Sequence, residues 1–299
     1  MNVLVIYGGD SSERDISLMS GANVGEALKM AGHTVSFFDP AAGLFTLSKA
    51  LKGVEVVFPI LHGKGGEDGV IQHALELENV PYVGSGSEVS AACFDKWRTI
   101  QIAKQITFPE TELVSRETIH DSVLLKKPYV IKPRAEGSSV DTFIVHDPKD
   151  FDISKLDEVF DKYDDELLIE ECIAGQEITV PVLGKEALPV VEIIPPEGKE
   201  FDFTNKYNGA TTENCPPLFV AKDLQKQAQD IALTLHNTMK CRHFSRTDMI
   251  IDTKGQIYVL EINTLPGMTK ESLFPRAAKA AGMSAPELMD RLVTLATSK

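Results

Sequence analysis

The sequence has few cysteines and no long hydrophobic run. Its four cysteines lie far apart without a C-x-x-C pair, which argues against a disulfide framework and a thiolate metal site and leaves them as packing residues. No run reaches the roughly 18 apolar residues of a membrane helix. The chain starts directly with a strand-like segment rather than a signal peptide. We therefore expect a cytoplasmic protein with no membrane partner.

Positive charge is also scarce, because 30 Lys and Arg residues face 44 Asp and Glu residues and the formal charge is −14. Contacts to nucleic-acid phosphates need a basic surface, so a sequence-independent nucleic-acid binder is disfavoured. Neither G-x-x-x-x-G-K-[ST] nor G-x-G-x-x-G is present. The sequence therefore supports neither a P-loop nor a dinucleotide-binding fold. An anionic ligand must therefore bind in a local pocket.

The chain is long enough for several domains: 299 residues that are 43% hydrophobic predict a real core and two or three domains. We place the boundaries at 1–87, 88–183 and 184–299. The first part is expected to be α/β, with strands at 2–7, 34–38 and 54–58 around a helix that carries Ile16 to Met30. Its loops 8–13 and 62–68 follow strand ends, where ligands bind in such sheets.

The second part reads as α+β. It has a helical period over 88–105, a strand at 128–132 before a glycine and serine turn, and strands at 167–173 and 176–183. The third part begins with a strand at 188–194 and has a helix at 221–240. Between them, the irregular stretch 195–217 is long enough to suggest a functional loop.

A candidate magnesium site lies near the C-terminus. Apolar runs at 245–252 and 256–263 are joined by a turn, which predicts a hairpin. Alternation places Glu261 and Asn263 on one face with Val259 in phase, while Asp248 lies on the neighbouring strand. Two carboxylates and an amide oxygen suit Mg²⁺ when phosphates complete its shell. A Glu and an Asn two apart on a strand are more often only a solvated face.

Candidate phosphate and nucleoside contacts lie in the second part. Lys132 ends a strand just before a Gly-Ser-Ser turn, and a lysine with such backbone N–H groups can hold phosphate oxygens. The plain alternative is a hairpin with a surface lysine. Glu170 and Glu177 can accept hydrogen bonds from a nucleoside, or simply border a strand in solvent.

The first part offers two candidate ligand contacts. The glycine-rich loop that follows His62 needs unusual backbone angles or approaches a ligand closely. His62 itself is equally compatible with a satisfied loop histidine. Glu13 is either a favourable acid in the first turn of a helix or a carboxylate that holds an ammonium group.

Seven blocks in order along nearly the whole chain resemble the D-alanine:D-alanine ligases of the ATP-grasp superfamily. The blocks are Gly8–Ser17, His62–Gly69, Asp95–Lys96, Lys132–Ser139, Lys206–Tyr207, Arg246–Asp248 and Glu261–Leu273. Each block is moderately specific alone, and their order makes the match strong. The resemblance implies a three-domain ATP-grasp fold with an N-terminal parallel sheet.

The resemblance also implies ligands and roles. ATP would lie between the second and third domains, with two Mg²⁺ ions, or Mn²⁺, at the carboxylates. The implied ATP contacts are Lys96, Lys132, Glu170, Glu177 and Lys206, and the implied metal ligands are Asp248, Glu261 and Asn263. The first D-alanine would be held by Glu13, steadied through Ser138 and Tyr207, with His62 lining its site. The second would be held by Ser272 and Leu273, with Arg246 and the N–H of Gly267 at the oxyanion.

Some positions depart from the family pattern. Asp141 stands where the family usually has glycine and adds charge near the phosphate loop, where it either weakens ATP binding or points outward. His243 also replaces a usual glycine, and Phe201 and Phe203 stand where tyrosines are common on the lid, which the resemblance places at 195–217. These departures put turnover and nucleotide affinity in doubt.

The implied reaction is the ATP-dependent joining of two D-alanines through an acyl phosphate, for peptidoglycan precursors, by an enzyme expected to be a homodimer. A ligase for D-lactate or D-serine is the alternative within the class. Tyr207 favours the amine acceptor, because the D-lactate-using relatives resemble one another in having histidine there. An ATP-binding regulator that has lost turnover is the alternative from another class.

Overall fold

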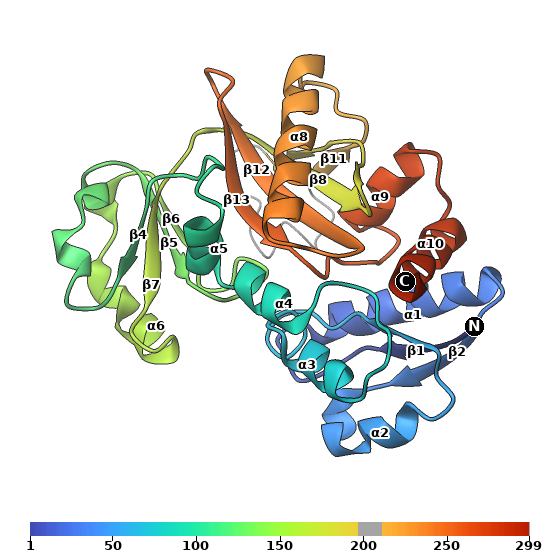
Figure 1. Cartoon of the computed structure of the whole chain (residues 1–299). Helices are drawn as coiled ribbons and strands as arrows, with labels where there is room; N and C mark the ends of the chain where they lie inside the picture. Colours follow the sequence, from blue (N-terminus) through green and yellow to red (C-terminus); the bar gives the residue numbers. More distant parts are fainter. Residues whose placement is uncertain (197–210, 299) are drawn as a thin grey trace.

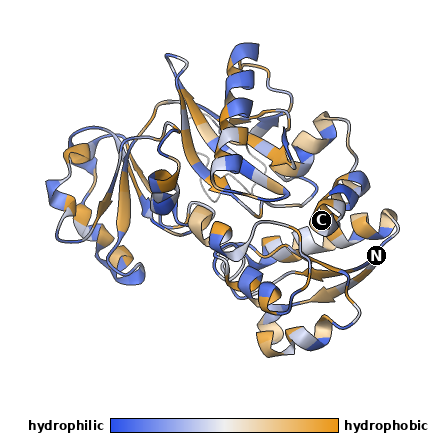
Figure 2. Cartoon of the chain, viewed as in Figure 1, coloured by the Kyte–Doolittle hydropathy of each residue, from blue (hydrophilic) through white to orange (hydrophobic). Residues whose placement is uncertain are grey.

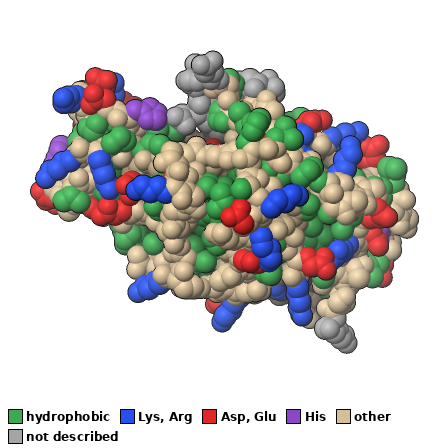
Figure 3. Space-filling model, turned by 90° about the horizontal axis from the view of Figure 1, so that it is seen from above, with side chains coloured by type: hydrophobic (Ala, Val, Ile, Leu, Met, Phe, Trp, Pro, Cys, Tyr) green, Lys and Arg blue, Asp and Glu red, His purple; other side chains and the backbone are tan. Residues whose placement is uncertain are grey.

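The computed structural model describes residues 1–196 and 211–298. The strands of this part of the chain form three sheets, of three, four and six strands (Figure 1). Figure 2 shows hydrophobic residues concentrated on these strands, and Figure 3 shows acidic and basic side chains interspersed on one face of the molecule. Most of the expected lid, with Lys206, Tyr207 and both lid phenylalanines, lies outside the described residues.

The N-terminal sheet is parallel, in the order β2-β1-β3, with β1 at Asn2–Ile6, β2 at Thr34–Phe38 and β3 at Val56–Pro59. Strands β1 and β3 are hydrophobic and buried on both sides, because helices cover both faces of the sheet, whereas the edge strand β2 is mostly exposed. Val3 and Val5 pack toward α1 (Arg14–Met30) and the C-terminal helices, whereas Leu4 and Ile6 pack toward α2 (Leu47–Ala50) and α3 (Val70–Leu77). The predicted α/β organisation of this part is confirmed.

The linking segment contains two helices where the sequence predicted one helical period. They are α4 at Ser87–Phe94 and α5 at Lys96–Ile102. Asp95 interrupts them because its backbone is extended, with φ −83° and ψ 100°, and its carboxylate accepts from the N–H of Arg98 as the N-cap of α5. The break places Lys96 at the first turn of α5.

The central sheet is antiparallel, in the order β4-β7-β5-β6. Its strands are β4 at Thr111–Val114, β5 at Tyr129–Pro133, β6 at Phe143–Val145 and β7 at Leu167–Glu171. One face packs on α6 (Asp157–Lys162) through a core that includes Tyr129, Ile131 and Phe160. The opposite face is left to line a cavity. Short 3₁₀ helices lie at 40–42, 44–46, 119–121, 123–126, 148–150 and 153–156.

The third sheet runs β11-β10-β8-β12-β13, with β9 paired to β8. Its strands are β8 at Gly175–Leu183, β9 at Glu186–Ala187, β10 at Val191–Ile194, β11 at Thr212–Asn214, β12 at Phe244–Asp252 and β13 at Ile257–Asn263. Helix α8 (Lys222–Thr238) covers one face through the core that contains Val180 and Val259. The sheets divide between β7 and β8, while the domain boundaries at 87/88 and 183/184 stay predictions.

The last helices, α9 (Leu273–Ala280) and α10 (Ala285–Thr297), return to the N-terminal part. Figure 1 shows α10 beside α1, and their hydrophobic residues share one core. The Asn23 amide donates to the carbonyl of Met268 at 2.6 Å, and His33 contacts Asp290 at 3.0 Å. The two ends of the chain are therefore packed together.

The predicted hairpin of β12 and β13 is present, but one detail of its alternation is wrong. A bulge between Asp248 and Met249 shifts the register, so that Asp248 pairs with Glu261 while Met249 pairs with Val259. Val259 and Ile262 are both buried against α8. Val259 is therefore not in phase with Glu261 and Asn263, because the bulge reverses the alternation between them.

Candidate active site

Two cavities adjoin where the three parts of the chain meet. The first encloses about 610 Å³ out to its opening and the second about 990 Å³. Both are lined by Lys96, Glu136, Gly137 and Glu261. A ligand group in one cavity can therefore reach a ligand group in the other.

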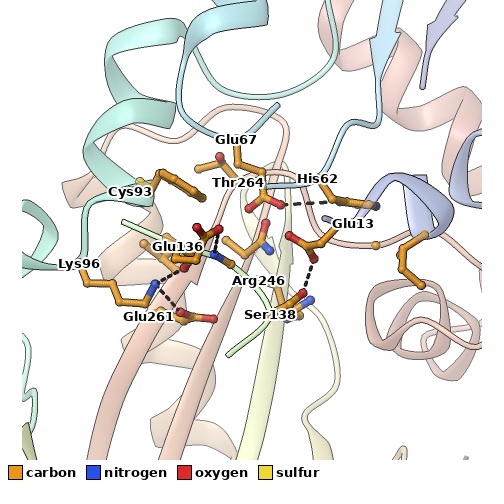
Figure 4. A pocket seen from close by; sticks show the side chains of 16 residues that line it. Glu13, His62, Glu67, Cys93, Lys96, Glu136, Ser138, Arg246, Glu261 and Thr264 are labelled. Atoms are coloured by element: carbon orange, nitrogen blue, oxygen red, sulfur yellow. Dashed lines mark hydrogen bonds and ion pairs between the residues drawn. The ribbon is translucent and has the colours of Figure 1, made fainter. Parts of the chain in front are cut away.

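Glu13 is buried at the end of the first cavity, only 6% exposed, where the chain enters α1. The Ser138 hydroxyl donates to its carboxylate across the cavity wall (Figure 4). A Cβ at Gly137 would lie 2.7 Å from Glu13 Oε2, and one at Gly63 would lie 2.9 Å away, so a larger residue at either position would displace the Glu13 carboxylate. Burial, followed by the charge of Glu67, raises the pKa of Glu13.

His62 and Glu67 form the wall beside Glu13. His62 Nε2 lies 3.3 Å from Ser20 Oγ, and its Nδ1 lies 3.7 Å from Glu67 Oε1. The N–H of Gly63 donates to Glu67 at 3.0 Å. With Glu136 on the same cavity, this wall is acidic and favours a cationic ligand group.

The strands β12 and β13 bring two carboxylates side by side on the cavity floor. Arg246 binds Asp248 with both ends of its fork, at 2.8 and 2.7 Å, and Thr179 Oγ1 donates to Asp248 at 2.5 Å. Across the register, Glu261 Oε2 lies 3.2 Å from Lys96 Nζ. Each of these two carboxylates is therefore paired with a basic side chain, Asp248 with Arg246 and Glu261 with Lys96.

The second cavity lies between the central and C-terminal sheets. Lys132 Nζ pairs with Glu170 Oε2 at 2.7 Å, and both side chains are nearly buried. The remaining lining is partly apolar, with Ile144 and Leu260, and includes Glu177 on β8. Such a mixed, elongated cavity suits a ligand with a flat apolar part and a charged tail.

The loop that leads to α9 lies on the first cavity at Gly267. A Cβ at Gly267 would lie 2.9 Å from Ser272 Oγ, and the N–H of Thr269 donates to the same hydroxyl at 3.0 Å. Ser272 is the N-cap of α9, and the Leu273 side chain is buried in the core. This helix start offers backbone N–H groups, which favour a negatively charged ligand group.

With this geometry in place, the relatives of the chain become informative. Residues 98–294 match the family model "D-ala D-ala ligase C-terminus", and residues 42–85 match "D-ala D-ala ligase N-terminus". The chain belongs to the D-alanine–D-alanine ligase family. The resemblance noted in the sequence is thereby confirmed.

Curated D-alanine–D-alanine ligases support this membership. One from Actinobacillus succinogenes is 38% identical over 98% of this chain and 97% of its own length, and one from Methylorubrum populi is 40% identical over the same shares. Among solved structures, the Bacillus anthracis D-alanine–D-alanine ligase complexed with ATP has a TM-score of 0.84 at 31% identity, covering 99% of this chain and 97% of the other. The D-Ala:D-Ser ligase of Enterococcus faecalis has a TM-score of 0.82 at 28% identity, covering 98% of each. The ATP-grasp fold is confirmed.

Two departures from the family pattern prove compatible with the fold. Asp141 and His243 adopt φ angles of 52° and 59°, the region in which glycine is most easily placed. Asp141 points away from the second cavity and accepts hydrogen bonds from Lys162 and Tyr163, both at 2.6 Å. His243 Nδ1 accepts the N–H of Gly84 at 3.0 Å. Neither side chain lines the two cavities of this ligase-family protein.

Most of the predicted site residues that the structure describes line these cavities, but Ser272 and Leu273, proposed for the second amino acid, line neither. The first holds Glu13, His62, Ser138, Arg246, Asn263 and Gly267, and the second holds Lys132, Glu170, Glu177 and Asp248. Sequence reasoning missed Glu67 and Glu136 as lining residues. Glu67 lies in the motif block that contains His62, and Glu136 lies in the block that contains Lys132 and Ser138. Their position in these blocks was the available sequence signal.

Proposed function

We propose that this protein joins two molecules of D-alanine with ATP, through an acyl phosphate, and supplies D-alanyl-D-alanine for peptidoglycan precursors. The observation that carries the proposal is the pair of adjoining cavities. One ends in a buried carboxylate suited to an ammonium group, the other holds buried Lys132, and Lys96 borders both. An amino-acid carboxylate and a terminal phosphate can thus meet at their junction.

ATP would occupy the second cavity. Lys96 and Lys132 would hold its phosphates. In the structure Lys96 pairs with Glu261 and Lys132 pairs with Glu170, and the phosphates of magnesium-bound ATP would replace these carboxylates as partners of the lysines. Glu170 and Glu177 would accept from the adenosine. The proposed fifth contact, Lys206, lies outside the described residues.

The donor set on β12 and β13 fits a magnesium site. Asp248 and Glu261 are direct cross-strand partners, and Asn263 adds an amide oxygen, which now accepts the N–H of Leu265 at 2.8 Å. All three are hard oxygen donors, as Mg²⁺ requires, and Mn²⁺ accepts the same set. When bound, two such ions would offset the negative charge of the triphosphate.

The first D-alanine would place its ammonium group at Glu13. A carboxylate oxygen of this substrate then attacks the γ-phosphorus, ADP leaves, and an acyl phosphate forms. Ser138 holds Glu13 in place by its hydrogen bond, and His62 closes the wall behind it. The acidic wall of Glu67 and Glu136 would strengthen the attraction for the ammonium group. The further contact proposed for Tyr207 lies outside the described residues.

The second D-alanine would bind at the start of α9, with its carboxylate at Ser272 and the N–H of Leu273. Its uncharged amine attacks the carbonyl carbon, the bond from that carbon to the phosphate oxygen breaks, and inorganic phosphate leaves with the bonding electrons and takes up the proton that the amine loses as the amide forms. Negative charge develops on the carbonyl oxygen at this step. Arg246 and the N–H of Gly267 would stabilise it from the cavity floor.

We further propose that the enzyme acts as a homodimer in the cytoplasm. Within residues 1–196 and 211–298, none of the helices has the length and hydrophobicity of a membrane-spanning segment. Asp141 and His243, which raised the possibility of an impaired regulator, make their contacts away from both cavities.

A coupled assay of ADP release tests this function. Release should require D-alanine and Mg²⁺, and mass spectrometry should identify D-alanyl-D-alanine as the product. The panel should include D-serine and D-lactate as second substrates, each paired with D-alanine. If the enzyme prefers to join D-alanine to D-serine or D-lactate, it is a ligase for that second substrate. If it binds ATP but shows no D-alanine-dependent turnover, it is an ATP-binding regulator.

A further inference from the structure

The loop 136–141 borders both cavities and has an unusual backbone. Ser138, Ser139 and Asp141 have φ angles of 51°, 56° and 52°. Left-handed backbone is sterically disfavoured for residues other than glycine, so three such residues in four positions need support from the surrounding structure. Ser138 must nevertheless hold one orientation, because its hydroxyl donates to Glu13.

The C-terminal end of this loop is fastened to the segment that follows α6. Asp141 Oδ2 accepts from the Tyr163 hydroxyl and from Lys162 Nζ, each at 2.6 Å. The Tyr163 hydroxyl also lies 3.5 Å from Glu136 Oε2, at the other end of the loop. Tyr163 is partly buried against the central core, which includes Phe160, so this anchor is fixed.

The two partners of Asp141 differ in the support they give. The Lys162 side chain is 55% exposed, and an exposed ion pair contributes little because water screens it. The Tyr163 ring is held by the core, so its hydroxyl loses less freedom when it donates to a carboxylate. Most of the restraint on the loop therefore comes from Tyr163.

The N-terminal end of the loop is fastened independently. Arg134 binds Asp95 with a fork at 2.9 and 2.7 Å and reaches Glu166 at 2.6 Å. Lys96 Nζ donates to the carbonyl of Glu136 at 2.7 Å. The contact at Asp141 is a second fixed point, at the C-terminal end of the left-handed residues.

We propose that Asp141 and Tyr163 form a tether that positions Ser138 against Glu13 and so sets the affinity of the first amino-acid site. Asp141 is a positioning residue here, since it touches neither cavity. The consequence for affinity rests on the proposed function, whereas the tether itself is a property of the loop.

Four variants separate the tether from general stability. Tyr163→Phe removes only the hydroxyl and leaves the loop sequence intact, and Asp141→Gly removes the acceptor while keeping an easy φ. Asp141→Asn tolerates the same φ and keeps an oxygen acceptor, and Lys162→Met removes the exposed ion pair together with the ammonium group that lies 5.0 Å from the centre of the Tyr163 ring. Asp141→Asn is the conservative variant that should retain the contact with Tyr163, and Lys162→Met is the matched control.

Two measurements are made on each variant. Hydrogen exchange of the amides in 137–141 should quicken about three- to tenfold in Tyr163→Phe and Asp141→Gly, and less than about twofold in the other two. The KM for the first D-alanine should rise by about the same factor, with kcat and the KM for ATP within about twofold. The double variant Asp141→Gly/Tyr163→Phe should add little to either single change, because each single change already removes the same hydrogen bond.

Each result has a definite reading. Exchange in Tyr163→Phe equal to that of the wild type overturns the tether. Faster exchange with an unchanged KM for D-alanine overturns the role of the tether in affinity. If the KM for D-alanine, the KM for ATP and kcat all worsen by the same factor, the tether is only a general stabilising contact. If the wild type shows no D-alanine-dependent turnover, the proposed function fails, while the exchange data still decide the tether.

Discussion

Replacing Glu13 by glutamine should weaken substrate binding and stabilise the free protein. The carboxylate is 6% exposed, and its pKa is raised by burial and by the charge of Glu67. Without substrate this charge is poorly compensated, although Ser138 donates to it. Glutamine has the same shape and keeps an oxygen for Ser138, so Glu13→Gln changes mainly the charge.

The two effects have opposite signs and different sizes. Removing the partner of a buried ammonium group should cost about 2–4 kcal/mol in binding, which is roughly a 30- to 1000-fold rise in the KM for the first D-alanine. Removing an unfavourably buried charge should raise the free energy of unfolding by about 1 kcal/mol. For a chain of this size, that gain corresponds to a rise in Tm of about 2 °C.

The stability gain should also depend on pH. Because the folded protein raises the pKa of Glu13 above 4.5, the folded state takes up its proton first as pH falls. The penalty of the wild type is therefore complete above the folded pKa and disappears as pH falls toward 4.5. Melting curves of variant and wild type should converge over that window.

Initial rates give the KM for each substrate, and thermal melts without ligands give the stability. Glu117→Gln is the matched control, because Glu117 is an exposed glutamate on another part of the surface. Equal changes in the KM for D-alanine and for ATP would refute the ammonium contact. A variant less stable than the wild type at pH 8 would refute the claim that the buried charge is unfavourable.

Three further outcomes are expected. Glu261→Ala should lower turnover at least about a hundredfold and weaken Mg²⁺-dependent ATP binding in calorimetry, with an unchanged circular dichroism spectrum; full turnover would remove Glu261 from the metal site. Arg246→Ala should lower kcat by roughly a hundred- to a thousandfold and weaken ATP binding less, since Arg246 also orients Asp248; normal kcat at saturating ATP would make it only a phosphate contact. Burial lowers the pKa of His236 and His243 to about 4. As pH falls, these histidines are therefore protonated in the unfolded protein before they are protonated in the folded protein, and the free energy of unfolding should fall between pH 6.5 and pH 4 by up to about 3 kcal/mol for each histidine. His243→Asn should flatten this pH dependence, and an unaltered profile would assign the dependence to other groups.

The sequence by itself determined the local elements and the family. The strand at 34–38 matches β2 residue for residue, and the hairpin of β12 and β13 follows from two apolar runs and their turn. Such patterns depend on neighbours in sequence, which propensity and alternation can read. Ordered motif blocks then indicated which residues carry the chemistry.

Only the tertiary structure decided how these residues meet. Ser138 reaches Glu13 across 125 positions of sequence, and Lys132 meets Glu170 because β5 and β7 are neighbours in the central sheet. The bulge beside Asp248 reversed the expected phase of Val259. None of these contacts leaves a periodic signal, because each depends on how separate segments pack.

The same holds for the two replaced glycines. From the sequence, Asp141 and His243 were charges or bulk at positions where the family usually has glycine. In the fold, each occupies a left-handed backbone position and satisfies a distant partner, Tyr163 in one case and the N–H of Gly84 in the other. Local sequence can indicate that a position is unusual, but the partner that makes it acceptable is chosen by packing across the whole chain.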